Sequence, residues 1–172
     1  MGTPKALTSI GGNPAAEVLY ATCLKGGFQS VVLVLGKDIE VITSALDSPS
    51  IIPIHNPHPE RGRTGSIQVG IHALGKVERG VLLWPIDHPL VTLETIQLIE
   101  KELIPHGVVC PQYKGKSGHP IGIGADLLPS LMAEEPHTPL RTWISVQNRH
   151  YLDVNDPGIL RNIDYPLDAK GV

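Results

Sequence analysis

Two aspartates stand where a carboxylate could hold a divalent cation against a phosphate. Asp87 lies in the segment WPIDHP (residues 84–89), directly after the apolar run GVLLW. In open α/β sheets, ligands bind beyond the carboxyl ends of strands, so a carboxylate held there between prolines could bind Mg²⁺. The alternative is a turn residue or a cap of the next helix. Asp164, in the segment NIDYP, has the same two interpretations, and the pattern alone favours a turn.

Basic and hydroxyl side chains gather in the segment RGRTGS (residues 61–66). Backbone N–H groups at the start of a helix, together with arginine, favour an anion or a nucleotide. The alternative is a surface loop that ends in a serine or threonine cap. Lys5 lies near the first residue of the sequence, where a lysine is normally only solvated.

Other possible sites have weaker patterns. Gly118-His119-Pro120 follows a turn, and its ordinary interpretation is a β-turn with a structural histidine. His55 and His58 have a spacing that metals tolerate, but prolines surround them and no cysteine joins them, which favours an exposed loop. The sequence contains no G-x-S-x-G, no P-loop lysine motif and no Cys-x-x-Cys. Cys23 and Cys110 each stand among apolar residues, which predicts two buried, reduced thiols.

The elements that must position these residues alternate along the chain. Asn13-Pro14 predicts a capped helix start, and Gly26-Gly27 its end. Periodicity predicts further helices over residues 39–46, 67–74, 92–103, 126–133 and 138–147, and strands over 30–35, 51–54, 80–84, 108–113, 119–123 and 151–154. The two strands around the turn at 114–118 suggest a hairpin. The alternation predicts a single domain over residues 1–172, a three-layer α/β/α sandwich with a mainly parallel, Rossmann-like sheet and a β-hairpin.

Composition narrows the functional classes. The 172 residues are 41% hydrophobic and 18% charged, as in ordinary globular domains, and the formal net charge is −3. This charge argues against a protein that binds nucleic acid through bulk positive charge. No apolar run is long enough to cross a membrane, and the first residues show no signal-peptide pattern. We therefore expect a cytoplasmic protein with neither nucleic acid nor membrane as a partner.

Several motifs follow one another in the order of a known family. The opening MGTPK resembles the end of the signature L-A-A-G-x-S-x-R-M-G-x-P-K, and Asn56-Pro57 with residues 62–70 resembles N-P…G-x-S-x-S-L-x-x-G-L. The segment PIDHP resembles the family's P-x-D-x-P turn, and Gly118-His119-Pro120 matches its G-H-P. The closing DPG and NIDYP resemble D-D-P-G and D-I-D-T-P. From end to end, the ordered set resembles the molybdenum-cofactor cytidylyltransferases, which are MobA-like nucleotidyltransferases.

The resemblance implies transfer of a nucleoside monophosphate, CMP favoured, from an NTP to a phosphorylated acceptor, with release of pyrophosphate. The favoured acceptor is molybdopterin or the molybdenum cofactor, and a molybdoenzyme or cofactor-transfer protein is a further possible partner. Lys5 and Asp87 become the catalytic residues, and Asp87 and Asp164 the Mg²⁺ ligands. The implied nucleotide-binding residues are Lys5, Asn56, Gly62, Thr64, Ser66 and Asp87; the implied acceptor-binding residues are Gly118, His119 and Pro120.

The sequence also departs from the family pattern. The family's first strand and its glycine-rich loop would precede Met1, and that strand is normally central in the sheet. We therefore expect unpaired sheet edges, exposed apolar surface and weak turnover. The alternatives are a nucleotide- or cofactor-binding pseudoenzyme and a sugar-phosphate nucleotidyltransferase. The residues Arg63-Thr64-Gly65, where the family has serines, and Trp84 before Pro85 leave the base preference open.

Overall fold

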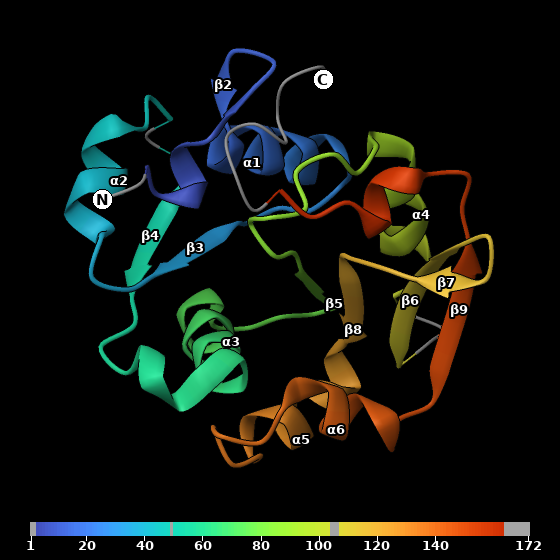
Figure 1. Ribbon diagram of the computed structural model, residues 1–172. Coiled ribbons are helices and arrows are strands. Elements are labelled where there is room, and N and C mark those ends of the chain that lie inside the picture. The colour runs from blue at the N-terminus through green and yellow to red at the C-terminus, as the bar shows by residue number, and fades with distance from the viewer. Residues whose placement is uncertain (1–2, 49, 104–106, 164–172) are drawn as a thin grey trace.

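The computed structural model describes residues 3–48, 50–103 and 107–163 (Figure 1). The helices are α1 (Ala15–Lys25), α2 (Ile39–Ala45), α3 (Gly62–Leu74), α4 (Leu93–Glu102), α5 (Leu128–Met132) and α6 (Leu140–Ser145). The strands are β1 (Ser9–Ile10), β2 (Asn13–Pro14), β3 (Val32–Leu35), β4 (Ile52–His55), β5 (Gly80–Leu83), β6 (Val108–Tyr113), β7 (Lys116–Ser117), β8 (Ile121–Gly124) and β9 (Arg149–Asp153). The predicted alternation of helices and strands is confirmed.

The larger sheet is mixed. Strand β8 lies between β5 and β6 and runs antiparallel to both, while β9 runs parallel to β6 on its other side. The predicted hairpin is present, because β6 pairs antiparallel with both β7 and β8. A Cβ atom on Gly122 would press against Leu103 and Ile99, so this glycine lets α4 pack closely on β8.

A second pair of strands stands apart from that sheet. Strands β3 and β4 run parallel, with Leu33 opposite Pro53. Proline has no N–H group to donate, which suits the outer edge of a sheet. On the other side, no hydrogen bond joins β3 to β5 among the described residues. Within the described part of the chain, the sheet is therefore split between β3 and β5, and each of these strands has an unpaired edge there, as we expected from the sequence.

Helices cover both faces of the sheet, which confirms the three-layer α/β/α class. One core cluster joins Val81 and Ile123 to α3, α5 and α6 through residues such as Leu131 and Trp143. On the opposite face, Ile96 of α4 packs with Leu82 and with Trp84 just beyond β5. Because Val81 and Leu82 face opposite layers, β5 follows the two-residue period of a strand buried on both faces.

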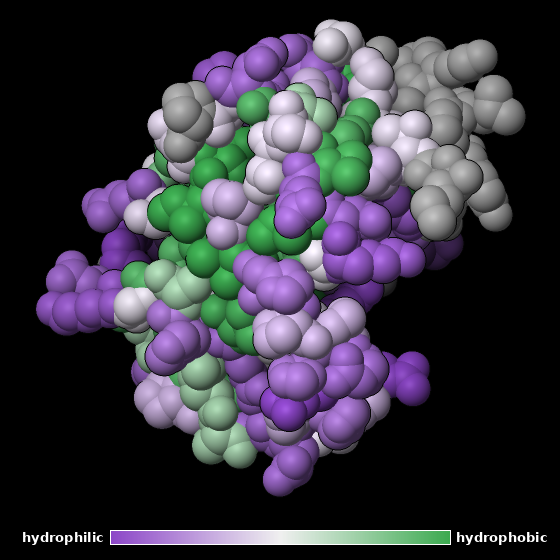
Figure 2. Space-filling model, turned by 90° about the vertical axis from the view of Figure 1, so that its left-hand side faces the viewer, coloured by the Kyte–Doolittle hydropathy of each residue, from purple (hydrophilic) through white to green (hydrophobic). Residues whose placement is uncertain are grey.

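Apolar residues also reach the surface. Figure 2 shows them in a band across the side of the molecule that carries α2 and β4. Val41 of α2 is 57% exposed and Ile52 of β4 is 48% exposed. Cys23 and Cys110 are both buried and free, as predicted. No helix among the described residues has the length and hydrophobicity needed to cross a membrane.

Two predicted boundaries were wrong. Pro14, not Asn13, is the N-cap of α1, and no side chain caps this helix because Asn13-Pro14 pairs with β1 instead. Helix α3 begins at Gly62, not at residue 67. Gly62, Thr64 and Ser66 therefore lie on the first turns of a helix and not in the preceding loop, so their directions follow the helical period.

Candidate functional site

The loop that carries Asp87 is held by its own backbone and by a distant segment. The Trp84 indole donates to the His88 carbonyl (2.9 Å), and the His88 N–H donates to the Pro85 carbonyl (3.1 Å). The Ile163 N–H donates to the carbonyl of Asp87 itself (2.7 Å). Asp87 therefore has a fixed position just beyond the carboxyl end of β5, where the sequence placed it.

The Asp87 carboxylate contacts two cationic or ionisable side chains. Its Oδ2 atom lies 3.5 Å from Nζ of Lys5. Its Oδ1 atom is buried, lies 3.9 Å from Nε2 of His88, and has no hydrogen-bond partner among the described residues. A buried carboxylate oxygen without a donor is costly, and a cation would remove that cost. The site therefore fits a divalent metal ion at Oδ1 of Asp87.

A buried carboxylate outside the predicted site holds this loop from the other end. Asp156 is 3% exposed, and its Oδ2 atom accepts hydrogen bonds from the Thr92 N–H (2.8 Å) and from the hydroxyls of Thr92 (2.9 Å) and Thr95 (2.8 Å). Its Oδ1 atom accepts from the Gly158 N–H (2.8 Å). A Cβ atom on Gly158 would collide with the Leu90 carbonyl, so only glycine allows this close approach. The DPG motif thus fixes the chain between Asp87 and α4.

His119 lies beside the Asp87 loop. Its ring meets the His88 ring edge to face, with the centroids 4.8 Å apart. The pKa of His119 is lowered from 6.5 to about 4, mainly by burial and in addition by the charges of His88 and Arg63, while Asp87 opposes this shift. The imidazole is therefore neutral near pH 7, and its buried Nδ1 has no hydrogen-bond partner within the described part of the chain. A neutral ring can donate one hydrogen bond to a ligand there, or accept one from it.

The motif around His119 is fixed by its backbone. The His119 N–H donates to the Ile159 carbonyl (2.9 Å), and the Gly118 N–H donates to the Pro111 carbonyl (2.9 Å). A Cβ atom on Gly118 would collide with the Ile159 carbonyl. Pro120 is buried and follows a cis peptide bond. Gly118 and Pro120 therefore position the His119 ring through the backbone.

The residues predicted on α3 and before it divide into two groups. Asn56 is 3% exposed; its amide donates to the Ser66 hydroxyl (3.0 Å), and its carbonyl accepts from the His58 N–H (2.9 Å). Thr64 is 1% exposed and donates to the Thr138 carbonyl (2.6 Å). These two side chains are occupied within the protein and position α3. Gly62, by contrast, has φ +84° and borders open space.

Arg63 and Ser66 point to the side where His119 lies. Both line a cavity of about 330 Å³ that also reaches Trp84, Pro85 and His119. Sequence analysis implicated the arginines of residues 61–66 only as a group, and it did not name His88 as a site residue. A helix start at Gly62 would have indicated Arg63, and the position next to Asp87 would have indicated His88.

The structure thus brings Lys5, Asp87 and His119 together, with Arg63 and Ser66 on the facing helix. Asp164 lies outside the described residues. Within the described ranges, no three His, Cys, Asp or Glu side chains form a metal-binding group. His58 pairs with Glu60 at the surface (3.1 Å), in the exposed loop that the prolines predicted. This arrangement can hold a polyphosphate with its metal ion. The lysine and the arginine provide positive charge for the phosphates, and the carboxylate oxygen can bind the metal ion.

The sequence pattern of the MobA-like NTP transferase domain family matches residues 1–153 of this chain. The chain belongs to the MobA-like NTP transferase family. It is therefore a member of a nucleotidyltransferase family, and its predicted resemblance is confirmed. No curated protein matches this MobA-like chain significantly in sequence.

Solved structures share the fold at low sequence identity. Rv0371c from Mycobacterium tuberculosis H37Rv is 19% identical, with a TM-score of 0.84 over 98% of this chain and 87% of that one. A nucleotidyl transferase from Methanothermobacter thermautotrophicus is 20% identical, with a TM-score of 0.78 over 95% and 81%. The molybdopterin-guanine dinucleotide biosynthesis protein A of Archaeoglobus fulgidus is 18% identical, with a TM-score of 0.68 over 98% and 88%. A further structure of Rv0371c, in complex with manganese, is 17% identical, with a TM-score of 0.77 over 89% and 82%.

Proposed function

We propose that this MobA-like chain transfers CMP from CTP to a phosphorylated acceptor, with molybdopterin favoured, and releases pyrophosphate. An acceptor phosphate oxygen forms a bond to the α-phosphorus of the nucleotide. The bond from that phosphorus to the bridging oxygen of the β-phosphate breaks, and pyrophosphate leaves with the electron pair. No covalent intermediate with the protein is needed, so catalysis depends on positioning and electrostatics.

One observation carries this proposal: the buried Oδ1 atom of Asp87 has no hydrogen-bond donor among the described residues, while Nζ of Lys5 lies 3.5 Å from the other oxygen of the same carboxylate. Lys5 provides positive charge for the phosphates, and Asp87 retains an oxygen for a metal ion. A divalent metal ion, when bound, would neutralise charge that develops on the phosphate oxygens. The manganese complex of Rv0371c supports a divalent ion in this fold, and we propose Mg²⁺ with Asp164 as a second ligand.

His119 suits the acceptor side of the site. Because its imidazole is neutral, it does not compete with Lys5 and Arg63 for the phosphates, and its Nδ1 atom can bond an acceptor group. Arg63 and Ser66 line the same cavity from α3 and are suited to the nucleotide. The molybdopterin-guanine dinucleotide protein among the similar structures supports a pterin acceptor, whereas the sequence of residues 62–70 favours cytosine.

The test is a pyrophosphate-release assay with CTP, Mg²⁺ and molybdopterin. We expect release that depends on the acceptor and that is lost in Lys5→Ala and Asp87→Asn. The surface variant Lys76→Ala, whose side chain is 86% exposed, is the matched control and should keep wild-type activity. Release from CTP that is equal with and without any phosphorylated acceptor would contradict the proposed transfer.

A second candidate is a nucleotide-binding protein without turnover. The gap between β3 and β5 favours it, because these two strands share no hydrogen bond within the described residues and the gap lies beside the candidate site. Losing even one preorganised donor typically costs about 10²–10³ in rate. Binding of CTP and Mg²⁺ by calorimetry, with no pyrophosphate released in the presence of acceptor, would select this candidate.

A further inference from the structure

Strand β9 forms the outer edge of the larger sheet on the right of Figure 1. It pairs parallel with β6 over all of its residues, Arg149–Asp153. Among the described residues, no strand pairs with its other side. A strand edge without a proline or a bulge is a template for pairing with another chain. A further strand can therefore be added to the sheet at β9.

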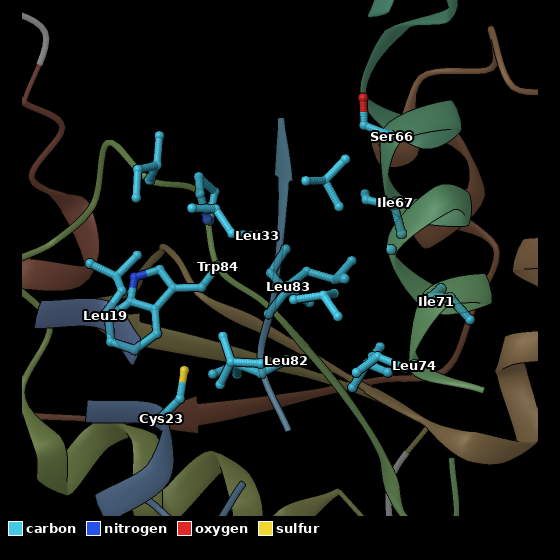
Figure 3. A pocket seen from close by; sticks show the side chains of 18 of the residues that line it. Leu19, Cys23, Leu33, Ser66, Ile67, Ile71, Leu74, Leu82, Leu83 and Trp84 are labelled. Atoms are coloured by element: carbon cyan, nitrogen blue, oxygen red, sulfur yellow. The ribbon is translucent and has the colours of Figure 1, made fainter. Parts of the chain in front are cut away.

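The other free strand edges are less suited to such pairing. The outer edge of β4 contains Pro53, which has no N–H group to donate. The facing edges of β3 and β5 border the cavity between two helices, and Figure 3 shows Ile67 and Ile71 of α3 on one side of it and Leu19 of α1 on the other. Of these edges, β9 alone combines full pairing on its inner side with an outer side that no described strand covers.

Two hydrogen bonds at the ends of β9 fix the direction of its backbone groups. The Val108 N–H donates to the Asn148 carbonyl (3.2 Å), and the Val154 N–H donates to the Gln112 carbonyl (2.8 Å). Along a strand, the N–H and C=O groups of successive residues point to opposite sides, so every second residue from Asn148 onward directs its groups to β6. The residues between them direct their groups outward. They are Arg149, Tyr151 and Asp153.

The side chains of the same three residues carry a symmetric pattern. Arg149 and Asp153 lie two residues before and after Tyr151, and all three residues are exposed. The Arg149 guanidinium carbon lies 5.4 Å from the centre of the Tyr151 ring. Arg149 and Asp153 are about 13 Å apart along an extended strand, so they cannot pair with each other. Neither forms an ion pair within the part of the chain that the structure describes.

This pattern is complementary to itself when two copies of the strand run antiparallel. With Tyr151 on the two-fold axis, Arg149 of each copy lies opposite Asp153 of the other, and the two Tyr151 side chains lie opposite each other. The outward backbone groups of these residues then face each other and can form hydrogen bonds. Opposite charges directly across a strand pair are stabilising. A parallel pair would instead place like charges opposite each other and would not close as a dimer.

We propose that the outer edge of β9 is a self-association surface, at which a second copy of this chain adds its own β9 antiparallel about Tyr151. The larger sheets of the two copies then form one continuous sheet. Val146, three residues before β9, is 78% exposed and adds apolar surface near this edge. The contact is a single pair of short strands, so we expect the association to be weak and reversible.

Charge exchange tests the pairing. Sedimentation velocity over about 1–500 µM protein covers the affinities of small, transient interfaces, and we expect the wild type to dimerise within it. Arg149→Asp and Asp153→Arg each place like charges opposite each other, so each should weaken association by about tenfold or more. Combining the two changes makes the charges opposite again and should restore association. The matched control Lys37→Asp, at an exposed position before α2, should dimerise like the wild type.

Amide hydrogen exchange followed by NMR identifies the strand and its direction. As the protein concentration rises, the outward amides of Arg149, Tyr151 and Asp153 should become protected. The amides of His150 and Leu152, which face β6, should change little. Tyr151→Pro removes the central outward donor and leaves the groups that face β6 in place, so it should remain a folded monomer. Thermal unfolding of each variant checks that it is folded.

The proposal fails on any of three outcomes. A wild type that stays monomeric up to about 500 µM would show that the charges of β9 protect this edge instead. Dimerisation that the combined charge exchange does not restore would show that Arg149 and Asp153 do not pair between copies. Protection confined to Ile52–His55, or to Val32–Leu35 and Gly80–Leu83, would place the contact at another edge. If a variant does not fold, the exchange pattern of the wild type still decides, and no outcome depends on nucleotide transfer.

Discussion

The Nζ atom of Lys5 lies 3.5 Å from Oδ2 of Asp87, although the two residues come from opposite sides of β3, β4 and β5 in the sequence. The Lys5 side chain is 43% exposed and that of Asp87 is 21% exposed, so the pair itself adds little stability. Its arrangement instead brings a partly exposed positive charge next to a carboxylate whose loop is held by hydrogen bonds. A phosphate bound here would contact the Lys5 ammonium group and a metal ion held by the Oδ1 atom of Asp87.

Replacing Asp87 with asparagine should abolish Mg²⁺-dependent binding of CTP and barely change the melting temperature. The amide removes the negative charge that holds the cation, while the loop keeps its backbone hydrogen bonds. Isothermal titration and thermal unfolding measure the two effects. Asp153→Asn, at an exposed position on β9, is the control and should bind normally. An Asp87→Asn variant with wild-type affinity for Mg-CTP would show that the metal site lies elsewhere.

CTP should protect the protein against heat more strongly than GTP at equal concentration. The reason is the sequence of residues 62–70, which resembles the cytidylyltransferase pattern, together with Arg63 and Ser66 in the cavity wall. A tenfold difference in affinity corresponds to about 1.4 kcal/mol at saturating ligand, which is roughly 3–6 °C in melting temperature. Thermal shift measurements with both nucleotides decide, and stronger protection by GTP would reverse the assigned base.

His119 should make the folded state less stable in acid. Its pKa is about 4 when folded and 6.5 when unfolded, so the unfolded chain binds more protons between these values. Stability linked to this residue is fully present above pH 6.5 and falls as the pH drops towards 4. Denaturant unfolding of wild type and His119→Gln in metal-free buffer measures it. The difference between the two should shrink from pH 7 to pH 4, whereas His137→Gln, at an exposed position, should follow the wild type. A constant difference would contradict this role.

Replacing Asp156 with alanine should destabilise the fold by about 3 kcal/mol, because it leaves the buried donors of Thr92, Thr95 and Gly158 unpaired. The melting temperature should fall by roughly 6–12 °C. Asp153→Ala removes a carboxylate at an exposed position and should have little effect. Because Asp156 fixes the loop after Asp87, nucleotide binding should weaken at temperatures where the variant is still folded. A fall in stability no larger than that of Asp153→Ala would show that the four bonds contribute little.

The sequence predicted those features that depend on local patterns. The two-residue and helical periods located the strands and helices, and Gly26-Gly27 and Thr92 marked helix ends correctly, because these signals act within one turn or one strand. The position of Asp87 followed from a strand that ends just before it. The order of the motifs identified the family. These features need no knowledge of which distant segments meet.

Only the tertiary structure decided which side chains share the site. The contact of Lys5 with Asp87 and of His88 with His119 depends on segments that pack together from distant parts of the sequence. Thr64 was predicted to bind nucleotide, but the start of α3 at Gly62 turns its hydroxyl to the Thr138 carbonyl, where it is buried. The direction of a helical side chain changes by about 100° for each residue. A boundary shifted by a few residues therefore decides whether a hydroxyl reaches the ligand or the core, and the hydrogen bonds that settle this boundary come from elsewhere in the fold.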